Sequence, residues 1–140
     1  MQIVVTHDPS PEDVEVVNAG LMQYNADTYD RWERMPLAVL VRDPDTGEAV
    51  GGLVGRTSLG VLFVDTVHLP AALRGTGLGR KVLQEAESEA VRRGCRNAVL
   101  FTAAFHAPDF YARLGWRVFG EIPSTPPGAT RFWMTKELPG

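Results

Sequence analysis

The spacing of apolar residues along the chain predicts a short first strand followed by a helix. Residues 2–6 are rich in β-branched side chains, which favours a strand. Ser10, Pro11 and two acidic residues are typical of a helix start, where serine caps free amides and acids meet the positive end of the helix dipole. Apolar residues then recur at three- and four-residue spacing and predict one buried face: Val14, Val17, Leu21 and Tyr24. Residues 25–35 have no clean period, and we expect a short helix or a loop over a cleft.

The middle of the chain predicts three strands and a long helix. The strands are expected at residues 37–42, 48–57 and 59–69, and the last is nearly continuous in apolar residues, as in a central strand covered on both faces. A glycine-rich turn follows, and the helix after it has an apolar row at Leu78, Val82, Ala86 and Ala90. Two opposite-charge pairs at i,i+4 spacing lie on its outer face: Lys81–Glu85 and Glu89–Arg93.

The last third of the chain predicts a closing set of strands around a short helix. The strands are expected at residues 97–102, 116–121 and 130–137, and the last two flank a proline-rich loop. The short helix opens at Pro108 and stops at Gly115. This element order predicts an α+β domain with a mixed sheet.

Length, composition and charge narrow the class of protein. A chain of 140 residues is about one domain, so we expect residues 1–140 to form a single domain. The single cysteine, Cys95, cannot form an intramolecular disulfide, which fits a reducing cytoplasm. The start of the chain lacks signal-peptide features, and no stretch approaches the roughly 20 apolar residues of a membrane span. The formal net charge of −3 argues against neutralisation of nucleic-acid phosphates. We therefore expect a cytoplasmic domain that binds neither membranes nor nucleic acids.

The glycine-rich turn before the long helix is the first candidate site, and it reads Arg74-Gly75-Thr76-Gly77-Leu78-Gly79. Alternating glycines let the backbone curl so that successive N–H groups point into one hollow at the positive end of the helix. Such a hollow can hold a pyrophosphate, and Arg74 adds a positive charge at its rim. The spacing matches neither the G-x-G-x-x-G dinucleotide fingerprint nor a P-loop. A turn that merely permits a tight bend is the alternative.

A second motif lies about thirty residues further on, where a short helix carrying Tyr111 ends in Leu-Gly-Trp. Tyr111 and Leu114 could simply pack inward at i,i+3 spacing. Together, however, the two segments resemble the GNAT superfamily of acetyl-CoA-dependent N-acetyltransferases. The coenzyme loop of that family, [RQ]-x-x-G-x-[GA], is matched by Arg74, Gly77 and Gly79. Its later segment, A-x-x-[FL]-Y-x-x-x-G-[FWY], is matched by Ala107, Phe110, Tyr111, Gly115 and Trp116.

The resemblance implies a fold and a co-substrate. The fold is a GNAT-like acyl-CoA N-acyltransferase fold, a mixed αβα sandwich whose mostly antiparallel central sheet is splayed between its fourth and fifth strands. The co-substrate is acetyl-CoA, with its thioester beside that splay. The residues implied in coenzyme binding are Leu69, Arg74, Gly75, Thr76, Gly77, Leu78, Gly79 and Arg80. No metal is expected, because the three histidines and one cysteine show no metal-ligand spacing.

A further resemblance, to a branch of small, mostly uncharacterised bacterial GNAT proteins, is carried by Phe119-Gly120-Glu121, Pro126-Pro127-Gly128 and Thr130-Arg131. The chain also departs from the family at two positions. Ala104 stands where many members carry an asparagine that contacts the pantetheine arm. Ala129 stands where members of this branch often carry histidine. Neither departure affects the glycine turn or the tyrosine.

The resemblance assigns Tyr111 as the general acid, since a phenol stays protonated at neutral pH and can protonate a departing thiolate. Asp65, in an apolar strand, is either the general base, directly or through a water, or a hydrogen-bonded structural acid. His68 is the other candidate base. Strand alternation places His68 on the opposite face from Asp65 unless a bulge intervenes.

The expected acceptor is a primary amine of a small molecule that attacks the thioester directly in a ternary complex. Tyr24, Tyr29 and Trp32 could form an aromatic wall for it, or they could belong to a solvated helix face with a few packed aromatics. His106 could line the cleft, and the loop at residues 122–130 is placed to cover it. The alternatives are a protein lysine or N-terminal acetyltransferase and a non-catalytic acetyl-CoA-binding module. The resemblance is compatible with a homodimer.

Overall fold

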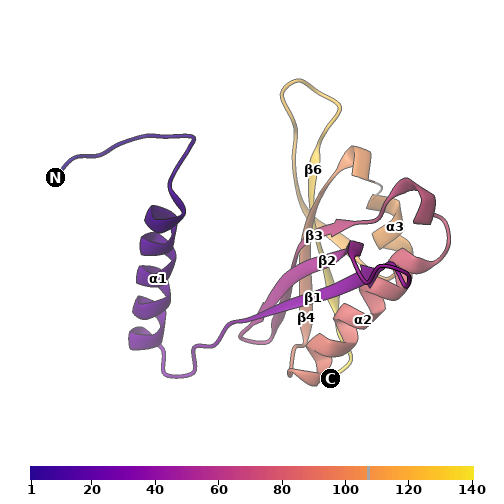
Figure 1. The fold of residues 1–140 in the computed structure, drawn as a ribbon, viewed down its shortest axis with the longest axis horizontal. Helices are drawn as coiled ribbons and strands as arrows, with labels where there is room; N and C mark the ends of the chain where they lie inside the picture. Colours follow the sequence, from indigo (N-terminus) through magenta and orange to yellow (C-terminus); the bar gives the residue numbers. More distant parts are fainter. Residues whose placement is uncertain (107) are drawn as a thin grey trace. The chain divides into compact units, whose positions relative to one another are not determined.

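The computed structural model describes residues 1–106 and 108–140, so Ala107 of the second motif lies outside the described residues. The chain divides into two compact units, Met1–Glu33 and Arg34–Gly140 (Figure 1). None of the helices in the described residues is long and apolar enough to cross a membrane.

The first unit contains one helix, α1 (Pro11–Thr28), in its 33 described residues. Its start is as predicted, because the Ser10 side chain accepts a hydrogen bond from the Asp13 amide. The predicted strand at residues 2–6 is wrong: these residues belong to no helix or strand. A strand needs a neighbour for its backbone groups, and this unit supplies none. The apolar row of α1 is exposed, so the predicted buried face is not formed within this unit.

The second unit is built on a mixed sheet that has six strands in the described residues, in the order β1-β2-β3-β4-β6-β5. Every neighbouring pair is antiparallel except β3 and β4. This confirms the predicted α+β class and the mostly antiparallel sheet. The strands are β1 (Met35–Arg42), β2 (Ala49–Ser58), β3 (Val61–His68), β4 (Asn97–Ala103), β5 (Arg117–Ile122) and β6 (Arg131–Glu137).

The sheet opens between β3 and β4, as predicted. The two strands pair from Val61 with Asn97 as far as Val64 with Leu100. Beyond that point no further pair joins them in the described residues, although β3 continues to His68 and β4 to Ala103. The splayed strands are the third and fourth rather than the fourth and fifth, because the predicted first strand is absent.

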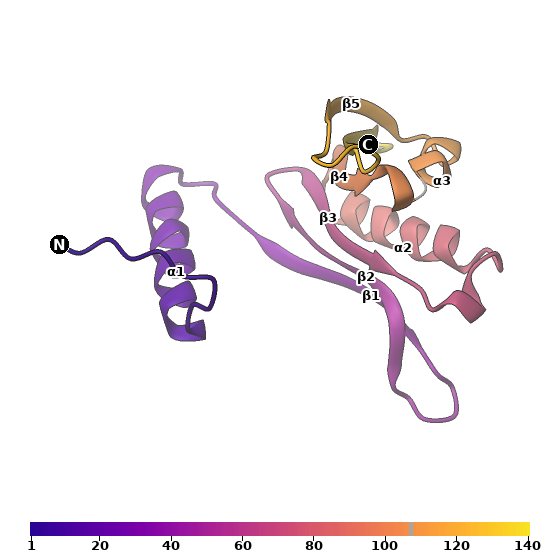
Figure 2. The same ribbon diagram turned by 90° about the horizontal axis from the view of Figure 1, so that it is seen from above.

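Helix α2 (Leu78–Arg92) covers one face of the sheet (Figure 2). Its predicted apolar row is largely confirmed, since Val82, Ala86 and Ala90 are buried, together with Leu83. These side chains pack on alternate residues of the strands, which is the pattern expected when one face of a strand meets a helix. The core that results includes Leu53, Leu62, Leu100 and Met134.

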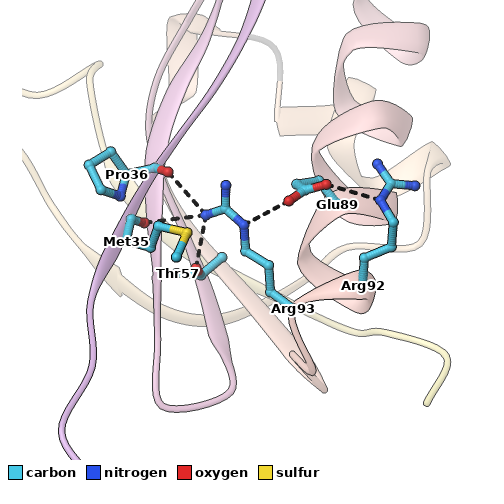
Figure 3. Close-up of polar contacts among 6 residues, drawn as sticks. All are labelled: Met35, Pro36, Thr57, Glu89, Arg92 and Arg93. Atoms are coloured by element: carbon cyan, nitrogen blue, oxygen red, sulfur yellow. Dashed lines mark hydrogen bonds and ion pairs between the residues drawn. The ribbon is translucent and has the colours of Figure 1, made fainter.

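Arg93 fixes the C-terminal end of α2 to the first two strands (Figure 3). Its Nη1 donates to the carbonyl oxygens of Met35 at 3.4 Å and Pro36 at 3.0 Å, and to the buried Thr57 hydroxyl at 3.1 Å. Its Nε donates to Glu89 at 2.8 Å, which confirms the predicted i,i+4 pair. The Arg93 side chain thus joins α2, β1 and β2 at one point.

Candidate active site

The glycine-rich turn lies between β3 and α2, after a short 3₁₀ helix at Ala71–Leu73 that the sequence did not predict. Two side-chain bonds shape the turn. Arg74 Nε donates to the Leu69 carbonyl oxygen at 2.9 Å, and the Thr76 hydroxyl donates to the Leu73 carbonyl oxygen at 2.6 Å. Gly75 and Gly77 have φ angles of 76° and 84°, in the left-handed region that favours glycine.

The start of α2 forms an open hollow that suits an anion. Gly77 caps the helix without a side-chain hydrogen bond, so the first amides of α2 have no capping acceptor among the described side chains. A Cβ atom added at Gly77 would meet no heavy atom within 4 Å. The hollow is lined by Thr76, Gly77, Leu78, Arg80, Lys81 and Gln84. Free amides, the helix dipole and two cationic side chains therefore point to a bound anion.

Lys81 and Gln84 were missing from the predicted coenzyme residues. They follow Gly77 at four- and seven-residue spacing, which places them on the same helix face as the turn. That spacing was the signal available in the sequence. The prediction instead paired Lys81 with Glu85, whereas in the described part of the chain Lys81 lines the hollow and forms no ion pair with Glu85.

Gly79 has a different role from the two glycines of the turn. A Cβ atom at this position would lie 3.3 Å from Phe110 Cζ and 3.5 Å from Leu69 Cδ1. The missing side chain therefore lets the first turn of α2 approach the end of β3 and the helix α3 (Pro108–Arg113). The two predicted motifs meet at this contact.

Tyr111 lies on α3 and packs against the core. Its ring centroid is 5.2 Å from that of Phe110 and 6.3 Å from that of Trp116, both in edge-on arrangements. Burial raises the pKa of the Tyr111 phenol above its ordinary value. The hydroxyl is therefore protonated throughout the neutral range and can only donate its proton there.

Lys136 on β6 supports the end of α3. Its Nζ donates to the Leu114 carbonyl oxygen at 2.7 Å and forms an ion pair with Glu87 of α2 at 2.8 Å. Both charged side chains are largely shielded from solvent, so the contact holds α3 in a fixed position relative to α2. This arrangement fixes the helix that carries Tyr111.

Asp65 is the first residue of β3 beyond the paired segment, so it lies at the mouth of the splay. Arg56 Nη1 donates to its Oδ1 at 2.7 Å. The Arg56 guanidinium carbon also lies 4.4 Å from the Phe63 ring centroid. Asp65 therefore has a structural partner, and its side chain is still 48% exposed. The sequence did not indicate Arg56, because only the register of β2 with β3 brings the two residues together.

His68 shares a face with Asp65 because a bulge intervenes. Val64 pairs with Gly55 and Thr66 with Val54, so β3 carries one extra residue at Asp65. The extra residue places Thr66 and His68 on the sheet face that carries Val54 and Arg56. Asp65 lies on the same face, where it bonds to Arg56.

The remaining predicted acceptor residues are one histidine of the second unit and three aromatic residues of the first unit. His106 ends a 3₁₀ helix at Ala104–His106, where its ring packs edge-on against Phe105 at 4.3 Å. Tyr24, Tyr29 and Trp32 belong to the first unit, where Tyr24 and Tyr29 are exposed. Their role in acceptor binding stays a prediction. The described residues contain no group of three His, Cys, Asp or Glu side chains that could hold a metal ion.

Comparison with known proteins places this geometry in a family. The Acetyltransferase (GNAT) family profile matches residues 5–116. A blasticidin-S acetyltransferase from Streptomyces morookaense is 41% identical over 95 residues, which cover 67% of this chain and 70% of the relative. Acetyltransferase Atu2258 from Agrobacterium fabrum is 31% identical over 138 residues, which cover 99% of this chain and 100% of the relative. A crystal structure of a protein from Agrobacterium tumefaciens has a TM-score of 0.89 and 31% identity, covering 99% of this chain and 100% of that one.

The chain therefore belongs to the GNAT acetyltransferase family. It is an acetyltransferase with the GNAT acyl-CoA N-acyltransferase fold, as the two sequence motifs predicted. Acetyl-CoA is the co-substrate of this family.

Proposed function

We propose that this chain transfers an acetyl group from acetyl-CoA to a primary amine of a small molecule, by direct attack in a ternary complex. The observation that carries the proposal is the uncapped start of α2, where left-handed glycines leave an open hollow beside Arg80 and Lys81. The relative named a blasticidin-S acetyltransferase supports a small molecule as the acceptor. The family profile spans both compact units, which supports one N-acetyltransferase domain over residues 1–140.

In this proposal the start of α2 holds the pyrophosphate of the coenzyme. The amides of residues 78–80 donate to phosphate oxygens, while Arg80 and Lys81 supply positive charge. Arg74 contributes to the shape of the turn by its bond to the Leu69 carbonyl oxygen. The backbone N–H of Leu69, next to the end of β3, faces the thioester oxygen and stabilises the charge that develops on it.

Tyr111 acts on the departing sulfur. When the amine nitrogen attacks the thioester carbon and the carbon–sulfur bond breaks, the phenol hydroxyl donates its proton to the thiolate. A free thiol has a pKa of about 8.5 and a free phenol about 10, so complete proton transfer is uphill. Burial raises the pKa of Tyr111 further, which makes full transfer still less favourable. The phenol therefore stabilises the charge that develops on sulfur by a hydrogen bond, and the phenolate left after transfer regains its proton from solvent.

Asp65 receives the proton that the amine loses. Its Oδ1 accepts from Arg56, which fixes the carboxyl group at the mouth of the splay, and its Oδ2 is the oxygen that takes part. An amine of pKa about 10.4 is mostly protonated at neutral pH, so a base is needed before attack. His68, on the same face, and a water molecule are the alternatives to Asp65 in this role.

The test is release of free coenzyme A thiol from acetyl-CoA with a panel of small primary amines and, in parallel, lysine-containing peptides. We expect thiol release that depends on a small amine, with double-reciprocal plots that intersect as required for a ternary complex. Parallel plots would indicate a covalent acetyl-enzyme and contradict direct attack. Turnover with the peptides alone would contradict a small-molecule acceptor.

A further inference from the structure

Three aromatic side chains form a cluster on β4, β5 and β6, and the sequence assigned none of them to a site. This aromatic cluster consists of Phe101, Phe119 and Trp133. The Trp133 ring centroid lies 4.5 Å from that of Phe101 and 6.4 Å from that of Phe119. Phe101 and Trp133 are directly opposite each other on β4 and β6. All three are exposed: Phe101 by 40%, Trp133 by 39% and Phe119 by 54%.

The aromatic cluster lies on the face of the sheet opposite α2. Leu100 and Met134 are neighbours of Phe101 and Trp133 along the chain and belong to the core beneath α2. Because successive side chains of a strand point to opposite faces, Phe101 and Trp133 point away from that core. Gly120 pairs with Trp133, and a Cβ atom added there would lie 3.7 Å from the indole, so the glycine leaves room for the ring.

The aromatic cluster reaches the point where β4 separates from β3. Phe101 is the first residue of β4 beyond the pairing with β3, as Asp65 is the first such residue of β3. Continued pairing would place Asp65 and Phe101 directly opposite each other, but the strands separate at this point. Asp65 shares the face opposite α2, because its partner Arg56 lies over Phe63, the neighbour of core residue Leu62. One side of the splay thus offers a carboxylate and the other an aromatic surface.

We propose that the aromatic cluster binds the ring of an aromatic or heteroaromatic primary amine whose nitrogen is directed to Asp65. This inference rests on the proposed function and specifies the acceptor class for the same site. Exposed apolar patches rimmed by polar groups mark ligand-binding or interaction surfaces. The Arg131 guanidinium carbon, 5.4 Å from the Phe101 ring centroid, adds a cation that attracts the face of an electron-rich ring.

The experiment compares two amines that differ only in the character of the ring, 2-phenylethylamine and 2-cyclohexylethylamine. Both are assayed by release of coenzyme A thiol, and their equilibrium binding is measured by calorimetry in the presence of coenzyme A. Aromatic contacts predict a kcat/KM for the aromatic amine about three- to tenfold above that for the saturated one. Trp133→Leu and Phe101→Leu should remove this preference and leave the affinity for acetyl-CoA unchanged. Val118→Ala, at an exposed apolar position of β5 outside the aromatic cluster, is the control and should keep the preference.

Two kinetic results would overturn the aromatic subsite, and a third result would overturn the proposed function instead. Equal kcat/KM for the two amines in the wild type, or an equal loss for both in Trp133→Leu, overturns the aromatic subsite. If neither these amines nor the wider amine panel releases thiol, the proposed function fails, and the calorimetric preference then decides the subsite alone. A change in sedimentation of Trp133→Leu with unchanged kinetics for both amines also overturns the subsite and identifies the aromatic cluster as a contact between copies of the chain.

Discussion

Replacement of Arg93 by alanine tests how α2 is held on the sheet. The Arg93 side chain is only 21% exposed and joins α2 to β1 and β2 through its contacts with Pro36, Thr57 and Met35. Arg93→Ala removes these contacts and leaves the two carbonyl oxygens and the Thr57 hydroxyl without a cationic donor. The same helix forms the hollow at its other end, so its packing on the sheet also positions the hollow.

The structure gives the size of the expected loss. Nη1 carries two hydrogens, so at most two of its three acceptors are well bonded at once, and the 3.0 Å and 3.1 Å contacts are the shorter ones. A hydrogen bond from a charged group contributes about 1.5–3 kcal/mol, and partial exposure favours the lower end. We therefore expect the free energy of unfolding to fall by about 3 kcal/mol and the midpoint of thermal unfolding by about 10 °C.

Arg92→Ala is the matched control (Figure 3). Arg92 is adjacent in sequence and donates to the same Glu89, but its side chain is 63% exposed and forms no hydrogen bond or ion pair with the sheet among the described residues. Its replacement should change the free energy of unfolding by about 0.5 kcal/mol or less. Urea unfolding followed by tryptophan fluorescence gives both values. Two variants that agree within about 0.5 kcal/mol would refute the role assigned to Arg93.

Three further predictions concern ionisable groups. Tyr111→Phe should lower kcat about 100-fold or more and leave the affinity for acetyl-CoA unchanged. An unchanged kcat would exclude Tyr111 as the general acid. Because burial raises the pKa of Tyr111, the pH profile of wild-type kcat should show no loss from this group below about pH 10. Asp65→Asn should lower kcat about 100-fold or more, because an amide cannot accept the amine proton, whereas an unchanged kcat would favour His68 or water as the base. Hydrogen bonds from Arg93 and then Arg92 lower the pKa of Glu89 below 4.5. Glu89 therefore binds a proton more readily in the unfolded chain than in the folded one. Ionised Glu89 stabilises the folded state above its ordinary pKa, and this contribution is lost as the pH falls through the lowered pKa of the folded state. We expect Glu89→Gln to change the pH at which half of the protein unfolds in acid, and an unchanged midpoint would contradict the stabilising role of ionised Glu89.

Local patterns allowed most of the fold to be predicted. The strands of the second unit and α2 begin and end close to their predicted residues, because apolar periodicity and turn glycines act over a few positions. The strand at residues 2–6 failed because strand formation depends on a neighbour as well as on β-branched side chains. The glycine-rich turn before α2 could be located in the same way, since its glycine spacing is local.

The sequence could not reveal contacts that depend on cross-strand register. Arg56 meets Asp65 only because β2 and β3 pair with a bulge at that position. Phe101 meets Trp133 because β4 pairs with β6, although the two residues are far apart in the sequence. The acceptor surface proposed above is built from such contacts. The residues predicted for the acceptor were chosen from local context alone: Tyr24, Tyr29, Trp32, His68 and His106.

The binding of acetyl-CoA to Gly77→Asp, measured by calorimetry beside Gly94→Asp, tests the central claim most directly. Both glycines have left-handed backbones, with φ angles of 84° and 88°, and both have open space where a side chain would be added. The two variants therefore carry similar backbone strain and the same new charge, at opposite ends of α2. A carboxylate at Gly77 fills the hollow and repels phosphate. The affinity should fall at least about 100-fold, because charge-assisted hydrogen bonds to the phosphates can no longer form. Gly94→Asp should bind acetyl-CoA as the wild type does. Undiminished binding by Gly77→Asp, or an equal loss in both variants, would contradict the assignment of the start of α2 as the coenzyme site.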